Sequence, residues 1–396
     1  MFVAPTKSET NMAIIGIDAR FYGTIGKGLG RYTQKLIENL EKISAQDGPA
    51  SGRDQNQYVV FLRRENFDEY QPKNKNFQKV LADYRWYSFA EQLFFPRVLR
   101  KYNFDFVHFP HFNVPLLYRR KFVITIHDLI LIHFPTIRNS TLSPILYWIK
   151  FLAYKIAIRS AIYRSQKIIT VSEFTKKDIQ SVYKNIPESK IVVTYEACDK
   201  ENQESVANGK EIIKSYGIIK PYIVYVGNVY PHKNPERLVL AFKKIEELKR
   251  DVSLVFVGGE DYFYERLKKF VAENNVGNVV FAGFVPDSDL NVVLKESLAY
   301  IRPSLYEGFE LPPLEAMSQG VPVLCSDHAC ALEVLGDSAL YFEGKNVESI
   351  NEAVLKILDN DELRQDLITK GYEQIKKYSW EKMGRETLEI YKKIRN

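Results

Sequence analysis

Short apolar runs, rich in β-branched residues, recur along the chain, and longer amphipathic stretches separate most of them. Continuous apolar runs of this length indicate strands that are buried on both faces of a sheet. Strands that alternate with helices predict an α/β fold built on parallel sheets. The expected strands are 13–18, 58–62, 104–109, 122–127, 167–171 and 190–194 in the first half, and 222–227, 253–258, 279–283, 298–302, 321–325 and 339–342 in the second.

The alternating pattern occurs twice, and a polar break at 198–211 separates its two copies. A chain of 396 residues is also longer than a single hydrophobic core usually supports. We therefore expect two doubly wound, Rossmann-like domains that face each other across a cleft. Ligands of such sheets bind at the carboxyl ends of the strands, so the candidate site residues are sought there.

One strand end carries the stretch "RPSLYEGFELPPLEAMSQGVPVLCSD", residues 302–327. Glu307 follows a predicted strand, and Gly308 allows the backbone to approach a ligand closely. Pro312–Pro313 begin a helix at positions where proline is tolerated, and Gly320 ends it. Glu315 is expected in the first turn of this helix, across the loop from Glu307.

The start of this helix is a candidate anion site. The N–H groups of Phe309, Glu310 and Leu311, together with the helix dipole, would face a bound anion. Two carboxylates beside such a pocket suit a ligand with both phosphates and hydroxyl pairs, such as a nucleotide sugar. Taken singly, Glu315 could merely favour the helix start and Glu307 could be a loop residue; the combination favours a binding site.

The same stretch resembles a known family. "EGFELPPLE" resembles the E-x(7)-E motif of retaining GT-B glycosyltransferases, the group 1 family. The other matching stretches follow in the family's order, and they are "IGIDARFYG...GLGRY" (16–32), "VHFPHFNVPLLY" (107–118), "TIHDLI" (125–130), "ITVSEFTKKDI" (169–179), "YVGNVYPHKNPERL" (225–238) and "VVFAGFVPDSDL" (279–290). Within the family, "HFPHFNVP", "TIHDLI" and P-x-K-N look most like mannosyltransferases that use GDP-mannose.

This resemblance implies a domain for each half of the chain. Residues 1–200, joined by a C-terminal helix at 380–396, would form an acceptor-side domain. Residues 201–379 would bind the nucleotide sugar. The implied activity is transfer of a hexose, with mannose as first choice, to a glycan or lipid-linked glycan in cell-surface polysaccharide synthesis. A UDP-sugar donor such as UDP-glucose or UDP-GlcNAc remains an alternative.

The resemblance also implies roles for individual residues. His127 and Glu307 would act at the donor sugar as catalytic residues, Lys233 would bind the diphosphate, and Glu315 would hold the ribose. The remaining donor-binding candidates are Asn228, His232, Phe284, Val285, Phe309, Glu310, Leu311 and a loop with Gly28 and Gly30. The acceptor-side candidates are Arg31, Tyr32, His108, His111 and Asp128, of which His108 and His111 are expected beyond a strand end.

The chain departs from the family pattern in three ways. Asn228 stands where the family often has an arginine, which leaves one fixed cation fewer unless His232 or Arg237 compensates. Glu310 replaces the second glycine of the motif and adds a negative side chain near the sugar. The segment "CALEVLGD" lacks the proline usually seen before "EV". The first two departures leave the identity of the donor open.

No cofactor is expected beyond the nucleotide sugar, and no metal. "DSD" at 287–289 resembles the metal motif of the other glycosyltransferase fold, but its position favours a helix N-cap. "CSDHAC" places His328 between Cys325 and Cys330 without a further ligand nearby, so incidental thiols are favoured. Three cysteines without a C-x-x-C pair suggest a reducing compartment.

Charge is divided unevenly between the halves. Residues 1–200 carry 30 Lys and Arg against 18 Asp and Glu, whereas residues 201–396 carry 25 against 31. The apolar helix predicted at 144–163 contains three cations in its interior, which argues against a transmembrane span. Its two interpretations are peripheral attachment to anionic membrane and ordinary packing on the sheet. Residues 1–11 lack the apolar core of a signal peptide, so a cytoplasmic protein is expected, with peripheral contact at the inner face of the membrane as an option.

Three other functions fit the sequence less well. "GKGLG" has the wrong spacing for a dinucleotide fingerprint and begins too far beyond the first strand, which weakens a dehydrogenase hypothesis. Paired carboxylates also serve glycosidases, but hydrolysis leaves Lys233 and the anion-binding helix start without a role. A non-catalytic sugar-nucleotide-binding protein is the third alternative, and nothing in the sequence indicates a nucleic acid partner.

Overall fold

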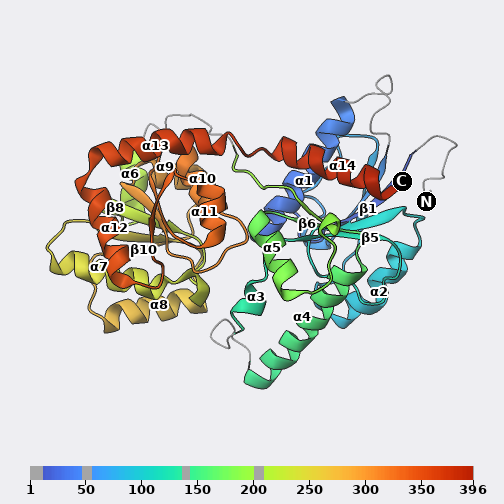
Figure 1. Cartoon of the computed structure of the whole chain (residues 1–396), viewed down its shortest axis with the longest axis horizontal. Coiled ribbons are helices and arrows are strands. Elements are labelled where there is room, and N and C mark those ends of the chain that lie inside the picture. Colours follow the sequence, from blue (N-terminus) through green and yellow to red (C-terminus); the bar gives the residue numbers. More distant parts are fainter. Residues whose placement is uncertain (1–11, 47–55, 136–142, 200–208, 396) are drawn as a thin grey trace. The chain divides into compact units, whose positions relative to one another are not determined.

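The computed structural model describes residues 12–46, 56–135, 143–199 and 209–395, and these form two compact α/β units (Figure 1). Unit 1 contains the described residues of 1–129, 145–196 and 379–396, and unit 2 those of 130–144 and 197–378. The segment 130–144, which the sequence assigned to the first domain, therefore groups with unit 2. Residues 1–11 and most of the polar break at 198–211 lie outside the described residues.

Unit 1 is built on a seven-stranded sheet in the order β3-β2-β1-β4-β5-β6-β7, and all of its strand pairs are parallel. From β1 to β3 the strands follow one another toward one edge of the sheet, and from β4 to β7 they follow one another toward the other edge. The topological switch point therefore lies between β1 and β4. The strands are β1 Ile14–Asp18, β2 Gln57–Leu62, β3 Phe77–Leu81, β4 Phe106–Phe109, β5 Phe122–Ile126, β6 Lys167–Thr170 and β7 Ile191–Val193.

Unit 2 is built on a six-stranded parallel sheet in the order β10-β9-β8-β11-β12-β13. Its switch point lies between β8 and β11, which are neighbours in the sheet but far apart in the chain. The strands are β8 Tyr222–Val226, β9 Ser253–Val257, β10 Val279–Gly283, β11 Ala299–Arg302, β12 Val323–Ser326 and β13 Ala339–Phe342.

Helices connect the strands in both units, as the alternating pattern predicts. In unit 1 they are α1 Lys27–Gln46, α2 Phe89–Arg100, α4 Pro144–Arg164, α5 Glu173–Val182 and α14 Trp380–Arg395. In unit 2 they are α3 Ile130–His133, α6 Gly209–Ser215, α7 Pro235–Glu247, α8 Tyr262–Glu273, α9 Asp287–Lys295, α10 Leu311–Ser318, α11 Ala329–Leu335, α12 Val347–Asp359 and α13 Asp361–Ile375. Among these described helices, none has the length and apolar character needed to cross a membrane.

Each strand expected from the sequence is present, with its ends displaced by at most two residues. The prediction missed β3, whose sequence "FQKVL" mixes polar and apolar residues. This strand lies at the edge of the sheet and pairs only with β2. An edge strand needs fewer apolar residues than a central one, so the apolar-run criterion does not detect it.

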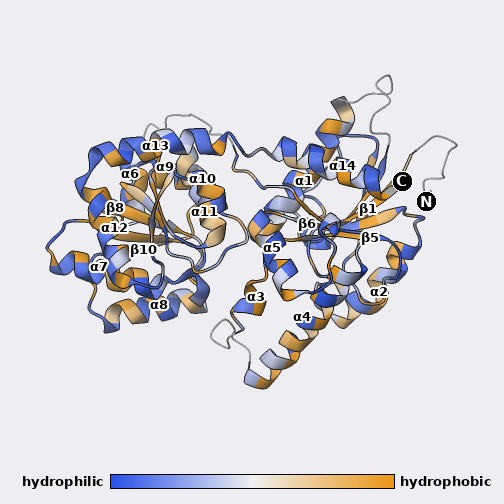
Figure 2. Ribbon diagram, viewed as in Figure 1, coloured by the Kyte–Doolittle hydropathy of each residue, from blue (hydrophilic) through white to orange (hydrophobic). Residues whose placement is uncertain are grey.

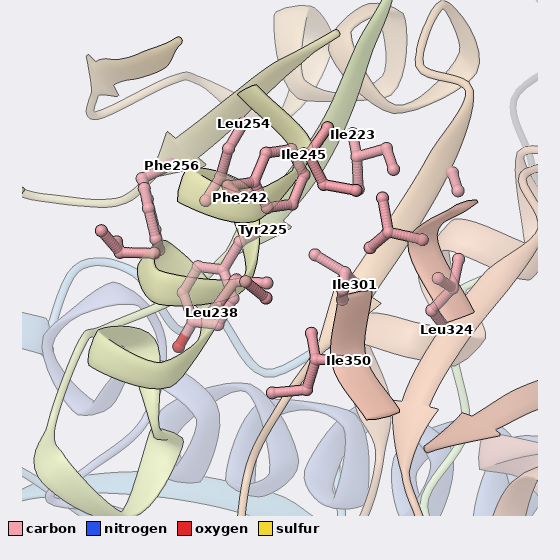
Figure 3. Close-up of a cluster of buried hydrophobic side chains, with 14 of the residues drawn as sticks. Ile223, Tyr225, Leu238, Phe242, Ile245, Leu254, Phe256, Ile301, Leu324 and Ile350 are labelled. Atoms are coloured by element: carbon pink, nitrogen blue, oxygen red, sulfur yellow. The ribbon is translucent and has the colours of Figure 1, made fainter. Parts of the chain in front are cut away.

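The core of unit 2 lies between its sheet and the surrounding helices (Figure 3). Tyr225 and Ile301 extend from the two strands at the switch point, and Leu238 and Phe242 reach them from α7. All four side chains are at least 98% buried. This packing fixes the ends of β8 and β11, which carry the loops of the candidate site.

In unit 1 the C-terminal helix α14 packs against α1. The approach is close, because a Cβ atom added to Gly384 would lie 2.9 Å from the Cβ of Asn39. Tyr391 of α14 lies 2.6 Å from Nδ1 of His108 in β4, measured from its hydroxyl oxygen. The last helix of the chain is therefore part of the core that supports β4.

Candidate active site

Two loops meet at the switch point of the unit 2 sheet, one after β8 and one after β11. Asn234, in the first loop, donates from Nδ2 to the carbonyl oxygens of Pro303 at 3.0 Å and Gly344 at 2.6 Å. The N–H of Leu305 donates to the carbonyl of His232 at 2.8 Å. These bonds tie the turn that carries Lys233 to the loop that carries Glu307.

A buried ionic cluster joins the two loops. Nζ of Lys233 lies 2.6 Å from both carboxylate oxygens of Glu307. Arg302, the last residue of β11, donates from Nη2 to the same carboxylate at 2.8 Å and from Nη1 to the carbonyl of Val226 at 3.2 Å. The sequence predicts Lys233 and Glu307 as site residues, but it does not indicate Arg302, which ends a predicted strand.

Burial and the neighbouring charges oppose each other in this cluster, and the net pKa of Lys233 stays below its usual value. Burial would raise the pKa of Glu307, but Arg302 and Lys233 together hold that pKa well below its usual range. Burial lowers the pKa of Lys233, and the adjacent Glu307 opposes that effect. An ammonium group has three N–H donors, of which two are directed at Glu307, so one remains for a ligand.

Glu310 extends the cluster on the other side of Arg302. Its side chain is fully buried, with Oε2 3.8 Å from Nε of Arg302 and Oε1 2.7 Å from Nε2 of His328. The glutamate that replaces the motif's glycine thus lies beside an arginine and a histidine, but neither of its carboxylate oxygens has a hydrogen-bond partner among the described residues.

Glu310, Cys325 and His328 also form a group that could hold a metal ion, with their ligand atoms within 4.8 Å of one another. The sequence interpretation found no further ligand near the cysteines and was wrong in that respect, because Glu310 comes from the preceding loop. Burial raises the pKa of the Cys325 thiol well above its usual value, and the charge of Glu310 raises it further. Metals bind the thiolate, so this environment disfavours a metal, and the prediction of no metal stays a prediction.

Besides Glu310, two further predicted donor-binding residues carry buried polar atoms that have no hydrogen-bond partner among the described residues. These atoms are Oδ1 of Asn228 and Nδ1 of His232. Burial and the adjacent Lys233 lower the pKa of His232 to about 4, so this imidazole is neutral near pH 7. Buried unpaired polar atoms at a strand end fit a site that receives a polar ligand. Arg237, considered as a replacement cation, instead donates to Oδ1 of Asn234 at 2.9 Å.

The helix start after Glu307 differs in one detail from the prediction. The residues Leu311, at the first position of α10, and Glu310, at its N-cap, fit the expected start. The first turn of α10 contains no acidic residue, and Glu315 lies beyond it. The prediction that Glu315 lies in the first turn was therefore wrong. Glu315 is half-buried. Phe309 is buried and its ring packs edge-on against Tyr378 at 5.6 Å between centroids.

The loop after β10 contains two further predicted donor contacts and the "DSD" segment. Phe284 is 75% exposed, whereas Val285 is buried. The N-cap of α9 is Pro286, which corrects the prediction that the "DSD" residues cap this helix. Asp287 and Asp289 instead lie in its first turn, and Asp289 accepts a hydrogen bond from Tyr216 at 2.7 Å.

In unit 1, His127 follows β5 and lies between two hydrogen-bond acceptors. Its Nδ1 is 3.1 Å from Oε1 of Glu196, and its Nε2 is 3.0 Å from the carbonyl oxygen of Pro110. An ionised carboxylate and a carbonyl can only accept, so both bonds require a proton on each ring nitrogen. Burial lowers the pKa of His127, but Glu196, the Pro110 carbonyl and Asp128 outweigh it and raise that pKa.

Glu196 could not be identified as a site residue from the sequence, because it is a single acid beyond a short strand. The pattern of His127 at a strand end was the only available signal. Tyr32 lies edge-on to the imidazole, at 4.6 Å between ring centroids. Thr175 donates to the carbonyl of His127 at 3.1 Å, which fixes its backbone as well. His127 is therefore fixed in orientation at the carboxyl edge of the sheet, in surroundings that raise its pKa.

Two predicted acceptor contacts lie in the core of unit 1 instead. His108 lies within β4, not beyond it, and is fully buried. Its Nε2 is 2.9 Å from Oγ1 of Thr125, and burial lowers its pKa to about 3. Tyr32 is also fully buried, with its hydroxyl 3.2 Å from the same Thr125 oxygen. Both predictions of acceptor contact fail, because these side chains are buried and have partners inside unit 1. His108 of β4 pairs with Thr125 of the neighbouring strand β5, and Tyr32 of α1 pairs with the same threonine.

The remaining candidates in unit 1 lie nearer the surface. His111 is half-buried after β4, with Nδ1 3.4 Å from the hydroxyl of Tyr87. Arg31 and Asp128 are half-buried as well. Gly28 and Gly30 lie in α1 and not in the loop that the sequence predicted.

These two glycines have different surroundings. A Cβ atom on Gly30 would come within 2.1 Å of the carbonyl oxygen of Gly23, so Gly30 serves chain packing. Gly28 has no atom within 4 Å of an added Cβ, so its surface is open to a ligand.

A second buried cluster supports the same edge of the unit 1 sheet. Arg20 is fully buried and donates to Asp18 at 2.7 Å and to Glu91 at 2.6 Å. Glu91 also accepts from Nδ2 of Asn113 at 2.7 Å and from the N–H of Tyr87 at 2.8 Å. The cluster thereby joins the loops after β1, before α2 and after β4. The motif "IGIDARFYG" contains Asp18 and Arg20, but nothing local in the sequence indicates their pairing with Glu91.

Two family models match the chain. The model described as Glycosyl transferases group 1 matches residues 209–374, and the model described as Glycosyltransferase Family 4 matches residues 53–202. The first range carries the cluster of Lys233 and Glu307, and the second carries His127 and Glu196. Both groups of candidate residues therefore lie inside matched regions.

Curated relatives match over nearly the whole chain. O-antigen chain mannosyltransferase B of Escherichia coli is 28% identical over 92% of this chain and 96% of its own length. O-antigen chain mannosyltransferase RfbU of Salmonella typhimurium is 26% identical over 91% and 94%. Among solved structures, sucrose-phosphate synthase from Thermosynechococcus elongatus superposes with a TM-score of 0.71 at 17% identity, covering 97% of this chain and 98% of that one. The structural match shows that the fold is GT-B, as the sequence predicted.

Proposed function

The chain belongs to the group 1 glycosyltransferases, and we propose that it transfers mannose from GDP-mannose to a glycan or lipid-linked glycan acceptor. The observation that carries this proposal is the buried cluster of Lys233, Glu307 and Arg302 at the switch point of unit 2. Full-length similarity to two O-antigen mannosyltransferases supports the choice of mannose and a role in cell-surface polysaccharide synthesis.

Lys233 is the residue best suited to the departing diphosphate. Its ammonium group is held in position by Glu307 and keeps one N–H donor for the ligand. A positive charge fixed before the reaction stabilises the negative charge that develops on the leaving group. With Lys233 and the start of α10 in this role, we propose that transfer needs no divalent metal or other cofactor.

The resemblance to the family implies transfer with retention of configuration. In that mechanism the acceptor hydroxyl attacks from the face that the diphosphate leaves, and the diphosphate takes the hydroxyl proton. His127 would contribute positive charge near the donor sugar, since both of its ring N–H groups are already engaged by Glu196 and the Pro110 carbonyl. We propose that the reaction takes place in the cytoplasm, where nucleotide sugars would be available.

The test is a donor screen that measures nucleoside diphosphate release in the presence of EDTA. GDP-mannose, UDP-glucose and UDP-GlcNAc are each supplied alone and with mannose-containing oligosaccharides as acceptors. We expect GDP-mannose to be used at least about tenfold faster, which corresponds to a difference of about 1.4 kcal/mol in transition-state binding. Faster release from a UDP-sugar would select the alternative donor. Binding without release would indicate a non-catalytic protein, and a loss restored by Mn²⁺ would contradict metal independence.

The two glutamates of the motif should affect different kinetic constants. Glu307→Ala removes the group that holds Lys233 and faces the reacting sugar, so we expect kcat to fall by roughly 10²-fold or more. Glu315→Ala removes a contact to the ribose, far from the bond that breaks, so KM for the donor should rise about tenfold with kcat nearly unchanged. Steady-state kinetics of both variants measure this division.

Glu265→Ala is the matched control, because Glu265 pairs with Lys268 on the surface of α8 and its side chain is 65% exposed. It should leave both constants unchanged. Full activity in both motif variants would show that the site assignment is wrong.

A further inference from the structure

An apolar stripe runs along the exposed side of α4. Ile145, Ile149, Leu152 and Ile156 are 76%, 60%, 60% and 51% exposed, and their spacing places them on one face of the helix. Trp148 lies at the edge of the stripe and is 48% exposed. Figure 1 shows this part of α4 extending beyond its unit, and Figure 2 shows its apolar positions in orange.

Only the other side of the helix is attached to the unit. The buried residues of α4 are Tyr147, Ile158, Ala161 and Ile162, and three of them lie in its last two turns. The sequence left two interpretations open for this helix, attachment to a membrane and packing on the sheet. Packing accounts for the C-terminal turns of α4 but leaves the stripe uncovered.

A second exposed apolar group adjoins the C-terminal end of α4. Phe89, Leu93 and Phe94 of α2 are 90%, 47% and 44% exposed, and Leu117 in the loop before β5 is 48% exposed. Two hydrogen bonds connect these segments. Arg164 of α4 donates to the carbonyl of Leu116 at 3.2 Å, and the N–H of Leu116 donates to Gln92 of α2 at 2.8 Å. We call the stripe and this group together the α2–α4 surface.

The α2–α4 surface is strongly basic. Residues 89–121 and 143–164 contain ten Lys and Arg but only two acids, Glu91 and Asp105. Glu91 is buried against Arg20, and Asp105 accepts a hydrogen bond from the N–H of Ile14 at 2.9 Å. Nine of the ten cations are exposed. Within these two described segments, the surface therefore combines exposed apolar side chains with exposed positive charge, and both carboxylates are engaged elsewhere.

We propose that the α2–α4 surface binds the surface of an anionic lipid bilayer. A helix with a tryptophan at the edge of an apolar face, flanked by cations, can lie at the boundary between headgroups and acyl chains. Long cationic side chains such as those of Lys150, Lys155 and Arg159 can reach the headgroups while the stripe enters the apolar layer. Under the proposed function, this attachment would bring the enzyme to a lipid-linked acceptor.

A second copy of the chain is the competing occupant of the stripe. Charge disfavours it, because α4 carries four cations and no acid. Two such helices packed against each other would bring like charges together, whereas anionic lipid headgroups neutralise them. The observations therefore favour a lipid surface over a dimer.

The test is co-sedimentation of the full chain with vesicles of phosphatidylglycerol and of phosphatidylcholine, at low and high salt. We expect binding to phosphatidylglycerol at low salt and at least a tenfold weaker apparent affinity in high salt. Ile149→Ser combined with Leu152→Ser should weaken that binding at least tenfold. Ile219→Ser combined with Leu248→Ser is the matched control in unit 2, since these side chains are 69% and 56% exposed, and it should bind like the wild type.

Several outcomes would overturn the proposal. These are no sedimentation with phosphatidylglycerol at low salt, equal sedimentation of the α4 variant, or equal binding to both lipids. Light scattering provides the remaining test. A dimer that forms without lipid and is lost in the Ile149→Ser, Leu152→Ser variant would identify the stripe as a protein interface. Donor hydrolysis by the α4 variant should match the wild type, which separates this test from that of the proposed function.

Discussion

Replacing Lys233 with methionine should reduce kcat/KM for the nucleotide sugar by roughly 10²- to 10³-fold, the loss typical of one fixed electrostatic group. Methionine keeps much of the length and apolar volume of lysine but removes its charge. The remaining partner of Glu307 is Arg302, at 2.8 Å, so the carboxylate keeps one cation and the loop keeps an anchor. The main expected loss is therefore the charge that faces the diphosphate.

Binding measurements distinguish this role from a structural one. Calorimetry should show weaker binding of GDP by Lys233→Met, whereas binding of guanosine, which has no phosphate, should change little. Lys268→Met is the matched control, because Lys268 also contacts two carboxylates, Glu260 and Glu265, but on the surface. Exposed pairs of this kind contribute about 0–1 kcal/mol to stability. A folded Lys233→Met protein that binds GDP as tightly as the wild type would show that this lysine does not hold the diphosphate.

The outline of the fold could be predicted because buried parallel strands leave an unambiguous signal. Strands such as "YIVYV" and "FVITI" are apolar at nearly every position, which amphipathic helices and surface loops are not. Glycine and proline around Glu307 also identified a loop and a helix start from local sequence alone. In each case the deciding information lies within a few neighbouring residues.

The partners of the site residues could not be predicted in the same way. Glu307 contacts Lys233 from 74 positions away, and His127 contacts Glu196 from 69 positions away. A motif names one member of such a pair, but only the fold selects the other. Arg302 shows the difficulty most clearly, because a charged residue that ends a strand can equally face solvent.

The same limit explains the failed acceptor assignments. A histidine near a strand end is predicted to face a ligand, and His127 does lie at the carboxyl edge of the sheet, directly after β5. His108 follows the same pattern in sequence, yet Tyr391, 283 positions away, lies 2.6 Å from its ring. The polar group is buried because the C-terminal helix returns to unit 1 and provides a partner there. The two histidines cannot be told apart without knowledge of that helix.

The partner of His127 leads to the second prediction: Glu196→Gln should lower the pKa of the His127 imidazole by about one to three units. Glutamine keeps the size and one oxygen acceptor but removes the negative charge. Burial, which lowers the pKa of His127, would then be opposed only by the Pro110 carbonyl and by Asp128. His111 and His108 also face this ring, and both have pKa values lowered to about 3, so neither adds charge near neutral pH.

The sign of the effect on activity follows from the charge of His127. If the cation is the active form, wild-type activity persists until the pH rises above the raised pKa of His127 and then falls. In Glu196→Gln that decline should begin at lower pH, and at pH values above both pKa values kcat should drop by up to about tenfold for each unit by which the pKa falls. Activity at acidic pH, where the histidine is protonated in both proteins, should be much less affected.

NMR titration of labelled histidine measures the shift independently of activity. The chain has six histidines, and a His127→Gln variant assigns the relevant signal. Glu188→Gln is the matched control, because Glu188 pairs with Lys176 at 3.3 Å on the surface of the same unit and its side chain is 80% exposed. Glu196→Asp should restore part of the wild-type profile, since it keeps the charge. An unchanged His127 titration in Glu196→Gln would show that Glu196 does not hold the imidazole as a cation, whatever happens to the rate.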